Sequence, residues 1–201
     1  MNEKFFNLSI DKQNTIINAG YKVFASYPYK KAPMSMISDE ANISKGLLFH
    51  YFENKKGLYL FLFNKAVAYS TEEAKETDVN EETDFFEFIS KTIKLRAKMV
   101  NSYPYMYQFV TRAYYEQNEI IKDAISTIKG SLHQMKKEEI LSRMDVSKFR
   151  NPSDIDQLFD IVIYLSEGYV YRNQENIVNS LDDMVQGTNK MFEILKKNFY
   201  I

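Results

Sequence analysis

Residues 42–58 read NISKGLLFHYFENKKGL, in which four ring-bearing residues, from Phe49 to Phe52, follow one another without a break. An amphipathic helix buries only one stripe of its surface, so these four rings cannot all face the same core. Asn42 is one of the few residue types that tolerate a left-handed turn. Ser44 is a favourable cap for a helix that runs to about Phe52. The stretch therefore predicts a turn and a short helix, with some of its aromatic rings directed away from the core.

The residues on either side complete a helix-turn-helix pattern. Apolar residues at helical spacing predict a longer helix that begins after Ser9 and ends at Pro28. A very short helix follows, with Pro33 expected as its first residue, and a further helix is expected to start after Asn54. Two short helices joined by a tight turn behind a longer helix form a helix-turn-helix unit, whose second helix enters the major groove of DNA.

This pattern divides the side chains of residues 44–55 into two groups. Leu47, Leu48 and Phe52 are expected to point into the small three-helix core. The remaining rings are then free to contact the sugar-phosphate surface or a thymine methyl group. Gly46 permits close approach of a backbone. Lys55, in the first turn of the next helix, combines an ammonium charge with a backbone N–H at a positive helix end, which suits a phosphate.

The rest of the chain continues at helical spacing. An acidic, polar segment at residues 70–84, Pro104 and the pair Asn151-Pro152 interrupt the pattern, and no alternation typical of a strand extends beyond a few residues. The sequence therefore predicts an all-α protein of about nine helices. We expect an N-terminal three-helix domain at residues 1–55 and a C-terminal helical domain at residues 56–201.

Composition and charge agree with a soluble DNA-binding protein. Residues 1–60 hold eight Lys and no Arg against five acidic residues, for a charge of +3, whereas the remainder carries −4. A basic N-terminal part suits a polyanion, although a difference this small also arises by chance. With no cysteine, no apolar run long enough to span a membrane and no basic-then-apolar leader, the expected location is the cytoplasm, without membrane contact.

The segment ISKGLLFHYFENKKGLY resembles the signature of the TetR family of bacterial transcriptional regulators, and the resemblance covers roughly residues 10–62. It implies a DNA-binding N-terminal domain and a larger helical domain for effector binding and dimerisation. It also implies that double-stranded DNA with a palindromic operator is one partner and a second copy of the chain another, joined through the two C-terminal helices. Most such regulators are repressors that a small molecule releases.

The resemblance also assigns DNA-contact positions. Lys45, Gly46 and Phe49 would lie nearest the bases, while Tyr51 and Lys55 would hold phosphates and His50 contribute to either. Two departures from the family pattern concern the turn, where Asn42 replaces a frequent Gly, and the start of the second helix, where Ser35 takes the phosphate contact. The full expected set is Ser35, Ser44, Lys45, Gly46, Phe49, His50, Tyr51 and Lys55. Without Arg in residues 1–60, we expect an A/T-rich operator.

The C-terminal domain is rich in tyrosine, which suits an apolar or aromatic effector of unknown identity. The expected pocket residues are Tyr103, Tyr107, Tyr114, Tyr164 and Glu167. For each Tyr, packing at a helix interface with the hydroxyl at the wet edge is the ordinary alternative. For Glu167, the alternative is a position at a helix rim or an ion pair.

Two other functions remain as alternatives. One is a helical small-molecule binding protein whose helix-turn-helix is vestigial, but the retention of Lys45, Tyr51 and Lys55 favours a working DNA reader. The other is an enzyme. With two His, no Cys, no G-x-G-x-x-G and no phosphate-binding loop, no catalytic constellation is apparent, so we expect neither enzymatic activity, nor a cofactor, nor a metal site.

Overall fold

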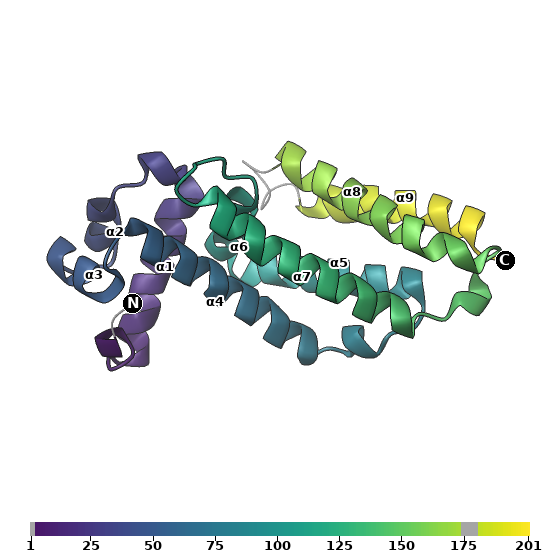
Figure 1. The fold of residues 1–201 in the computed structure, drawn as a ribbon, viewed down its shortest axis with the longest axis horizontal. Helices are drawn as coiled ribbons and strands as arrows, with labels where there is room; N and C mark the ends of the chain where they lie inside the picture. Colours follow the sequence, from purple (N-terminus) through teal and green to yellow (C-terminus); the bar gives the residue numbers. More distant parts are fainter. Residues whose placement is uncertain (1–2, 174–180) are drawn as a thin grey trace. The chain divides into compact units, whose positions relative to one another are not determined.

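The computed structural model describes residues 3–173 and 181–201, without the side chains of residues 131–136 and 181–184. Within these residues the chain is built of α-helices and short 3-10 turns, and a single bridge between Phe149 and Tyr200 is the only β-type pairing (Figure 1). The predicted all-α fold is thus confirmed. None of the described helices combines the length and apolarity that crossing a membrane requires. The nine described helices are α1 (Ile10–Ser26), α2 (Met34–Glu40), α3 (Lys45–Phe52), α4 (Lys55–Lys75), α5 (Phe85–Ser102), α6 (Pro104–Tyr114), α7 (Lys122–Arg143), α8 (Ile155–Asn173) and α9 (Leu181–Phe199).

The chain forms two compact units that are interleaved in sequence. The first comprises Met1–Ser70 and Tyr103–Lys129, and the second comprises Thr71–Ser102 and Gly130–Ile201. The predicted boundary after residue 55 falls at the first residue of α4, which continues without interruption to Lys75. The two compact units divide after Ser70, and α6 belongs with the N-terminal helices.

The first unit is organised around α1, which packs against both α2 and α6. Its core contains three rings in edge-to-face or tilted contact, with centroid distances of 4.8 Å from Phe24 to Tyr59 and 4.9 Å from Tyr59 to Phe109. Helices α1 and α4 approach closely at Gly20, where an added Cβ would lie 2.6 Å from Leu62 Cδ1. The Tyr21 hydroxyl donates to the Leu62 carbonyl at 3.0 Å and fixes the same crossing.

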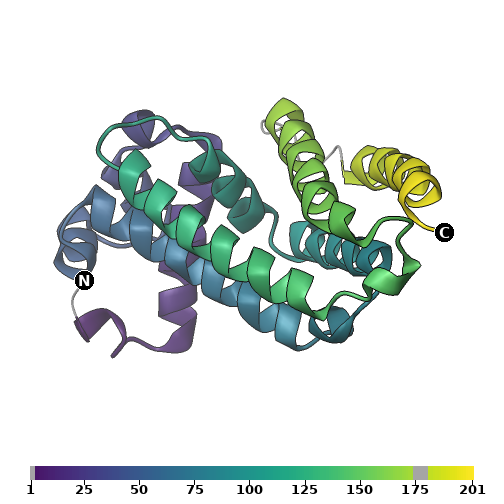
Figure 2. The same ribbon diagram turned by 45° about the vertical axis from the view of Figure 1, so that its right-hand side comes forward.

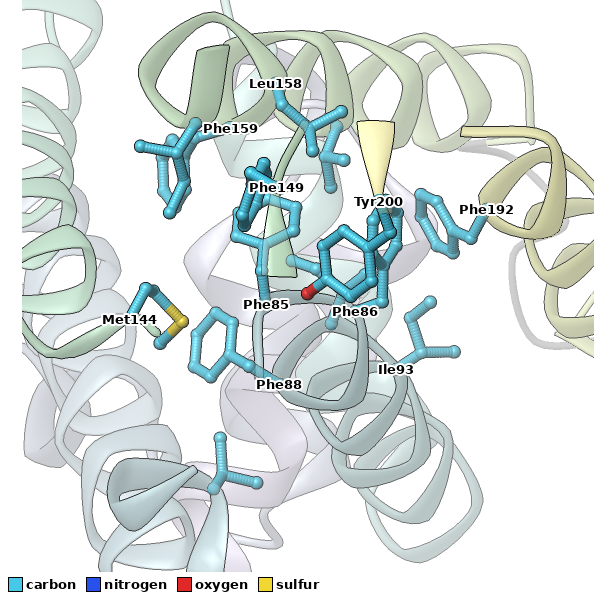
Figure 3. Packing of buried hydrophobic residues seen from close by; sticks show 14 residues of the cluster. Phe85, Phe86, Phe88, Ile93, Met144, Phe149, Leu158, Phe159, Phe192 and Tyr200 are labelled. Atoms are coloured by element: carbon cyan, nitrogen blue, oxygen red, sulfur yellow. The ribbon is translucent and has the colours of Figure 1, made fainter. Parts of the chain in front are cut away.

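The second unit is built mainly by α5 with α8, α9 and the segment after α7 (Figure 2). Its core is rich in aromatic side chains (Figure 3). The buried carboxylate of Asp84 organises its edge. It caps α5 by accepting from the backbone N–H groups of Phe86 and Glu87, both at 3.0 Å, and it also accepts from Lys148 Nζ at 2.8 Å and the Tyr200 hydroxyl at 3.2 Å. The core residues are Val79, Phe85, Phe86, Phe88, Ile89, Ile93, Met144, Phe149, Ile155, Leu158, Phe159, Val162, Phe192 and Tyr200.

Helices α8 and α9 keep large apolar side chains exposed. The exposed residues of α8 recur at helical spacing along one face, and those of α9 lie one turn apart. They are Ile161, Tyr164, Leu165 and Tyr171 on α8, and Met191 and Ile194 on α9. Such a patch on a monomer is typical of a protein interface.

Candidate nucleic-acid interface

Both ends of α3 are set by local hydrogen bonds. At its start, the backbone N–H of Leu47 donates to the Ser44 hydroxyl at 3.2 Å, as the sequence predicted. The turn before it contains Asn42 with a φ of 52°, so the predicted left-handed residue is also confirmed. At its end, Glu53 has a φ of 63° and its N–H donates to the Phe49 carbonyl at 2.7 Å. The sequence of this segment therefore fixes both the length and the start of the helix.

Helix α3 has one buried face and one exposed face. Leu48, Tyr51 and Phe52 are buried, whereas Lys45, Gly46, Leu47, Phe49 and His50 are exposed. Leu47 was expected in the core, and this is wrong: it is 38% exposed, because the 100° step from Leu48 turns it toward solvent. Lys45 Nζ lies 5.9 Å from the centre of the Phe49 ring. The exposed face thus offers a cation, two apolar side chains and a glycine at the helix start.

Tyr51 differs from the other predicted DNA contacts because its side chain is buried. Its ring lies 5.8 Å from that of Phe5, a fully buried residue in the 3-10 turn Glu3–Phe5. Phe5 also packs on Phe52 at 4.9 Å and on Phe61 at 5.5 Å. The ring was expected to face away from the core, and the N-terminal turn covers it instead. Helical periodicity within residues 42–58 contains no sign of this long-range contact.

Lys55 is the first residue of α4, as expected, but its ammonium already has partners. It donates to the carbonyls of Tyr29 at 2.7 Å and Ala32 at 3.1 Å, and it lies 4.6 Å from the centre of the Tyr29 ring. Partial burial lowers the pKa of this ammonium from its ordinary value. In this structure the side chain fastens the connection between α1 and α2, while the backbone N–H remains at the positive end of α4.

Residues of α6 and of the segment after it also bond the end of α1 and this connection. Arg112 Nε donates to the Ala25 carbonyl at 3.1 Å, and the Glu116 carboxylate accepts from the Tyr29 N–H at 3.0 Å. Sequence reasoning missed these two residues, because nothing in their local pattern indicates contact with a segment 87 positions earlier.

Ser35, a predicted phosphate contact, is the second residue of α2 and is half-buried. Its carbonyl accepts from the Ser38 hydroxyl at 2.8 Å. Pro33 precedes that helix rather than beginning it.

The predicted pocket residues divide between the two units. Tyr103, Tyr107 and Tyr114 belong to α6 or its cap in the first unit, and Tyr164 and Glu167 belong to α8 in the second. Tyr103 is exposed, with its ring 4.8 Å from that of Tyr69. Tyr107 is half-buried.

The remaining members of this set have distinct surroundings. The ring centre of Tyr114 lies 3.3 Å from Lys129 Nζ, which also donates to the Tyr114 carbonyl at 3.0 Å. Tyr164 is 69% exposed, within the apolar patch of α8, whereas Glu167 is half-buried. The exposure of Tyr164 suits a protein interface better than the interior of a pocket.

Comparisons with known proteins agree with this geometry. Residues 16–61 match the family profile described as bacterial regulatory proteins, tetR family, which confirms the resemblance seen in the sequence. The chain is 30% identical over 69 residues to an uncharacterized HTH-type transcriptional regulator, YhgD, from Bacillus subtilis (strain 168). That match covers 34% of this chain and 36% of the relative, so it spans about a third of each protein.

Solved structures resemble the whole fold. A TetR family transcriptional regulator from Chloroflexus aurantiacus J-10-FL covers 100% of this chain and 98% of its own, with a TM-score of 0.67 and 18% identity. The regulator FadR from Bacillus subtilis, solved in complex with stearoyl-CoA, covers 86% of this chain and 96% of its own, with a TM-score of 0.58 and 15% identity. At these identities the likeness establishes the fold.

Proposed function

Because the chain has the fold of a TetR-family transcriptional regulator with an N-terminal helix-turn-helix domain, we propose that it is a ligand-responsive repressor. In this proposal it binds a palindromic operator as a homodimer in the cytoplasm and is released by a small molecule. The observation that carries the proposal is the division of α3 into a buried face and an exposed face. A Ser-capped helix that exposes Lys45, Gly46, Leu47 and Phe49 at its start is suited to the major groove.

The chemistry of the exposed face indicates what it reads. Lys45 is the cation nearest the start of α3, where the first residues of a recognition helix meet base edges. Leu47 and Phe49 supply apolar groups that suit thymine methyls. We therefore keep the expectation of an A/T-rich operator, now with Leu47 added to the contact set. Ser35, Ser44 and His50 are proposed as further contacts to the DNA.

For Lys55 and Tyr51, the surroundings of the side chain determine which atom can contact a phosphate. For Lys55, we propose that the backbone N–H at the start of α4 contributes, because the ammonium is bonded to two carbonyls. For Tyr51, the ring is packed under Phe5, so a contact to phosphate falls to the hydroxyl at its tip.

A homodimer is supported by the exposed apolar residues of α8 and α9. A two-fold axis makes the same patch meet itself, and it places two recognition helices about 34 Å apart, one turn of DNA. An effector can shift such a dimer only by its difference in affinity for the DNA-binding and the released conformations. Helix α4, which starts at Lys55 beside α3 and runs to Lys75, is the element we propose to transmit that shift.

An effector binding site is supported by the tyrosines of α6 and by the fold itself. FadR, which shares the fold, is solved with stearoyl-CoA, so the architecture accommodates a ligand with a long apolar chain. The alternative function, a small-molecule binding protein with a vestigial helix-turn-helix, has the weaker support. Such a protein would have no need to keep a capped α3 with an exposed lysine.

The proposal is tested by selecting bound duplexes from a random DNA pool and titrating salt on the enriched sequence. We expect an enriched palindrome whose binding weakens steeply with salt, since each phosphate contact releases counterions. Lys45→Ala should weaken binding about tenfold or more and relax the sequence preference, because a base contact is worth about 1–3 kcal/mol. The matched control is Lys56→Ala, at an exposed position outside α3. Weak binding without enrichment would favour the ligand-binding alternative.

A further inference from the structure

Arg143, the last residue of α7, is half-buried, and two nitrogens of its guanidinium are buried without a partner among the residues that the structure describes. Both Nε and Nη2 are covered, and neither donates a hydrogen bond. The central carbon of the group lies over the buried ring of Phe88, 5.3 Å from the ring centre. Figure 3 shows Phe88 directed toward Met144, the neighbour of Arg143 in the chain. Two of the three guanidinium nitrogens are thus covered without a hydrogen bond.

An unpartnered arginine is costly in a protein, because the group stays charged at any accessible pH and cannot escape by losing its proton. Buried charges are therefore normally paired or fully hydrogen-bonded. An unsatisfied buried group in a folded protein is a reason to look for a missing ligand or ion.

The carboxylates around this end of α7 have other partners. Asp84 is bonded to Lys148 at 2.8 Å, and Lys91 takes both Asp78 at 2.6 Å and Glu82 at 2.8 Å. Asp145, two residues after Arg143, accepts from the backbone and hydroxyl of Ser147. These four acids are thus bonded to lysines or within a turn. Glu139, one turn before Arg143 on α7, is exposed, and neither buried nitrogen of Arg143 donates to it.

The two unbonded nitrogens of Arg143 lie side by side in a geometry that suits an anion. Nε and Nη2 form one edge of the guanidinium, and their parallel N–H groups match the two oxygens of a carboxylate or phosphate. We propose that this edge of Arg143 binds the carboxylate or phosphate group of an organic anion, and that this anion is the effector of the regulator. The second part of this inference rests on the proposed function, whereas the binding site itself does not.

The surroundings indicate that the anion has an apolar part. Phe88 and Met144 are buried, and Ile140 and Leu141, on the preceding turn of α7, pack against the same cluster. An ion without an apolar body would gain only the charge contact there, whereas an aromatic or aliphatic body also buries surface against these side chains.

The test compares thermal unfolding of the full chain with three matched probes: 4-phenylbutyrate, 4-phenylbutyl phosphate and the neutral 4-phenylbutanol. We expect at least one of the two anions to raise the Tm by about 3 to 6 °C at tenfold its Kd, with no comparable effect of the alcohol. The anion that binds more tightly tells whether the site prefers a carboxylate or a phosphate.

Two variants locate the binding. Arg143→Met keeps the length and the packing, and it should abolish the response to the anions. Without any probe it should unfold at the same temperature as the wild type or higher, because it removes two buried donors that have no partner. Arg143→Lys keeps the positive charge but lacks the two parallel N–H groups of the guanidinium, so it should weaken anion binding about tenfold or more.

Three results would overturn the site: no stabilisation of the wild type by either anion at millimolar concentration, equal stabilisation by the alcohol, or an undiminished response in Arg143→Met. A large loss of stability in Arg143→Met without probe would also overturn it, since Arg143 would then have an internal partner. DNA binding is measured separately. If the anion stabilises the chain without weakening its hold on the operator, the site stands and the effector role is rejected.

Discussion

At the scale of single residues, Lys55 shows how one side chain holds a DNA-binding domain together. Its ammonium bonds the carbonyls of Tyr29 and Ala32 and lies on the Tyr29 ring. We expect Lys55→Ala to lower the free energy of unfolding by about 1 to 2 kcal/mol, because two part-buried acceptors lose their charged donor. Urea unfolding measures this, with Lys56→Ala as the control at an exposed neighbour. Equal stability of both variants would contradict the structural role.

Asp84 gives a prediction on pH. Burial alone would raise the pKa of this carboxyl, but the bonds from Lys148, the Glu87 N–H and the Tyr200 hydroxyl hold the pKa below its ordinary value. A carboxyl whose pKa is lower in the folded state stabilises the protein above its unfolded pKa of about 3.9. That contribution is lost as the pH falls through the folded pKa. Asp84→Asn should therefore lower the Tm at neutral pH and flatten its dependence on pH below about 4.

The pH prediction is checked by thermal unfolding between pH 7 and pH 2, with Asp39→Asn as the control at an exposed carboxyl. If the Tm of Asp84→Asn falls at low pH as steeply as that of the wild type, other carboxyls determine the acid dependence.

At this scale the sequence predicts the residues whose partners are close in the chain, such as Ser44 and Asn42. It does not predict the burial of Tyr51 or the partners of Lys55, because both depend on residues more than 20 positions away.

At the scale of elements, Gly46 in α3 can be needed either for the folding of the helix or for its close approach to DNA. An added Cβ at Gly46 would meet nothing within 4 Å, so the protein itself does not require glycine there. We expect Gly46→Ala to raise the free energy of unfolding by up to about 1 kcal/mol, through helix propensity. Operator affinity should fall about tenfold in a binding titration, because the new methyl lies where the helix start approaches DNA.

Gly130 is the matched control for this prediction. It lies in α7 and is exposed, and a Cβ there also meets nothing within 4 Å. Gly130→Ala should give the same gain in stability without any change in operator affinity. If Gly46→Ala binds the operator as tightly as wild type, the start of α3 does not approach the bases closely.

The helices themselves were predictable from the spacing of their apolar residues, whereas the grouping of α6 with the N-terminal helices depends on contacts such as that between Arg112 and Ala25.

At the scale of the whole molecule, the exposed patch of α8 and α9 predicts the oligomeric state. Tyr164→Glu places a charge among Ile161 and Leu165, and we expect it to raise the dimer dissociation constant about 30-fold or more. Sedimentation measures this, with Ser126→Glu on α7 as the control for an added charge at an exposed site. A monomer should also lose operator affinity, since only one half-site is then bound. A dimer that survives Tyr164→Glu unchanged would place its interface elsewhere.

The interleaving of the two compact units has a consequence for synthesis on the ribosome. Residues 71–102 of the second unit are translated before residues 103–129 complete the first. When residue 70 emerges, the DNA-binding domain still lacks Phe109, Arg112 and Glu116, which supply a core ring, a bond to the end of α1 and a bond to the connection between α1 and α2. Domains generally fold as they are made, from the N-terminus onward. We therefore expect Phe24 and Tyr59 to stay partly uncovered in the nascent domain until α6 is made, and its folding in the cell to depend on chaperones that shield such apolar surface.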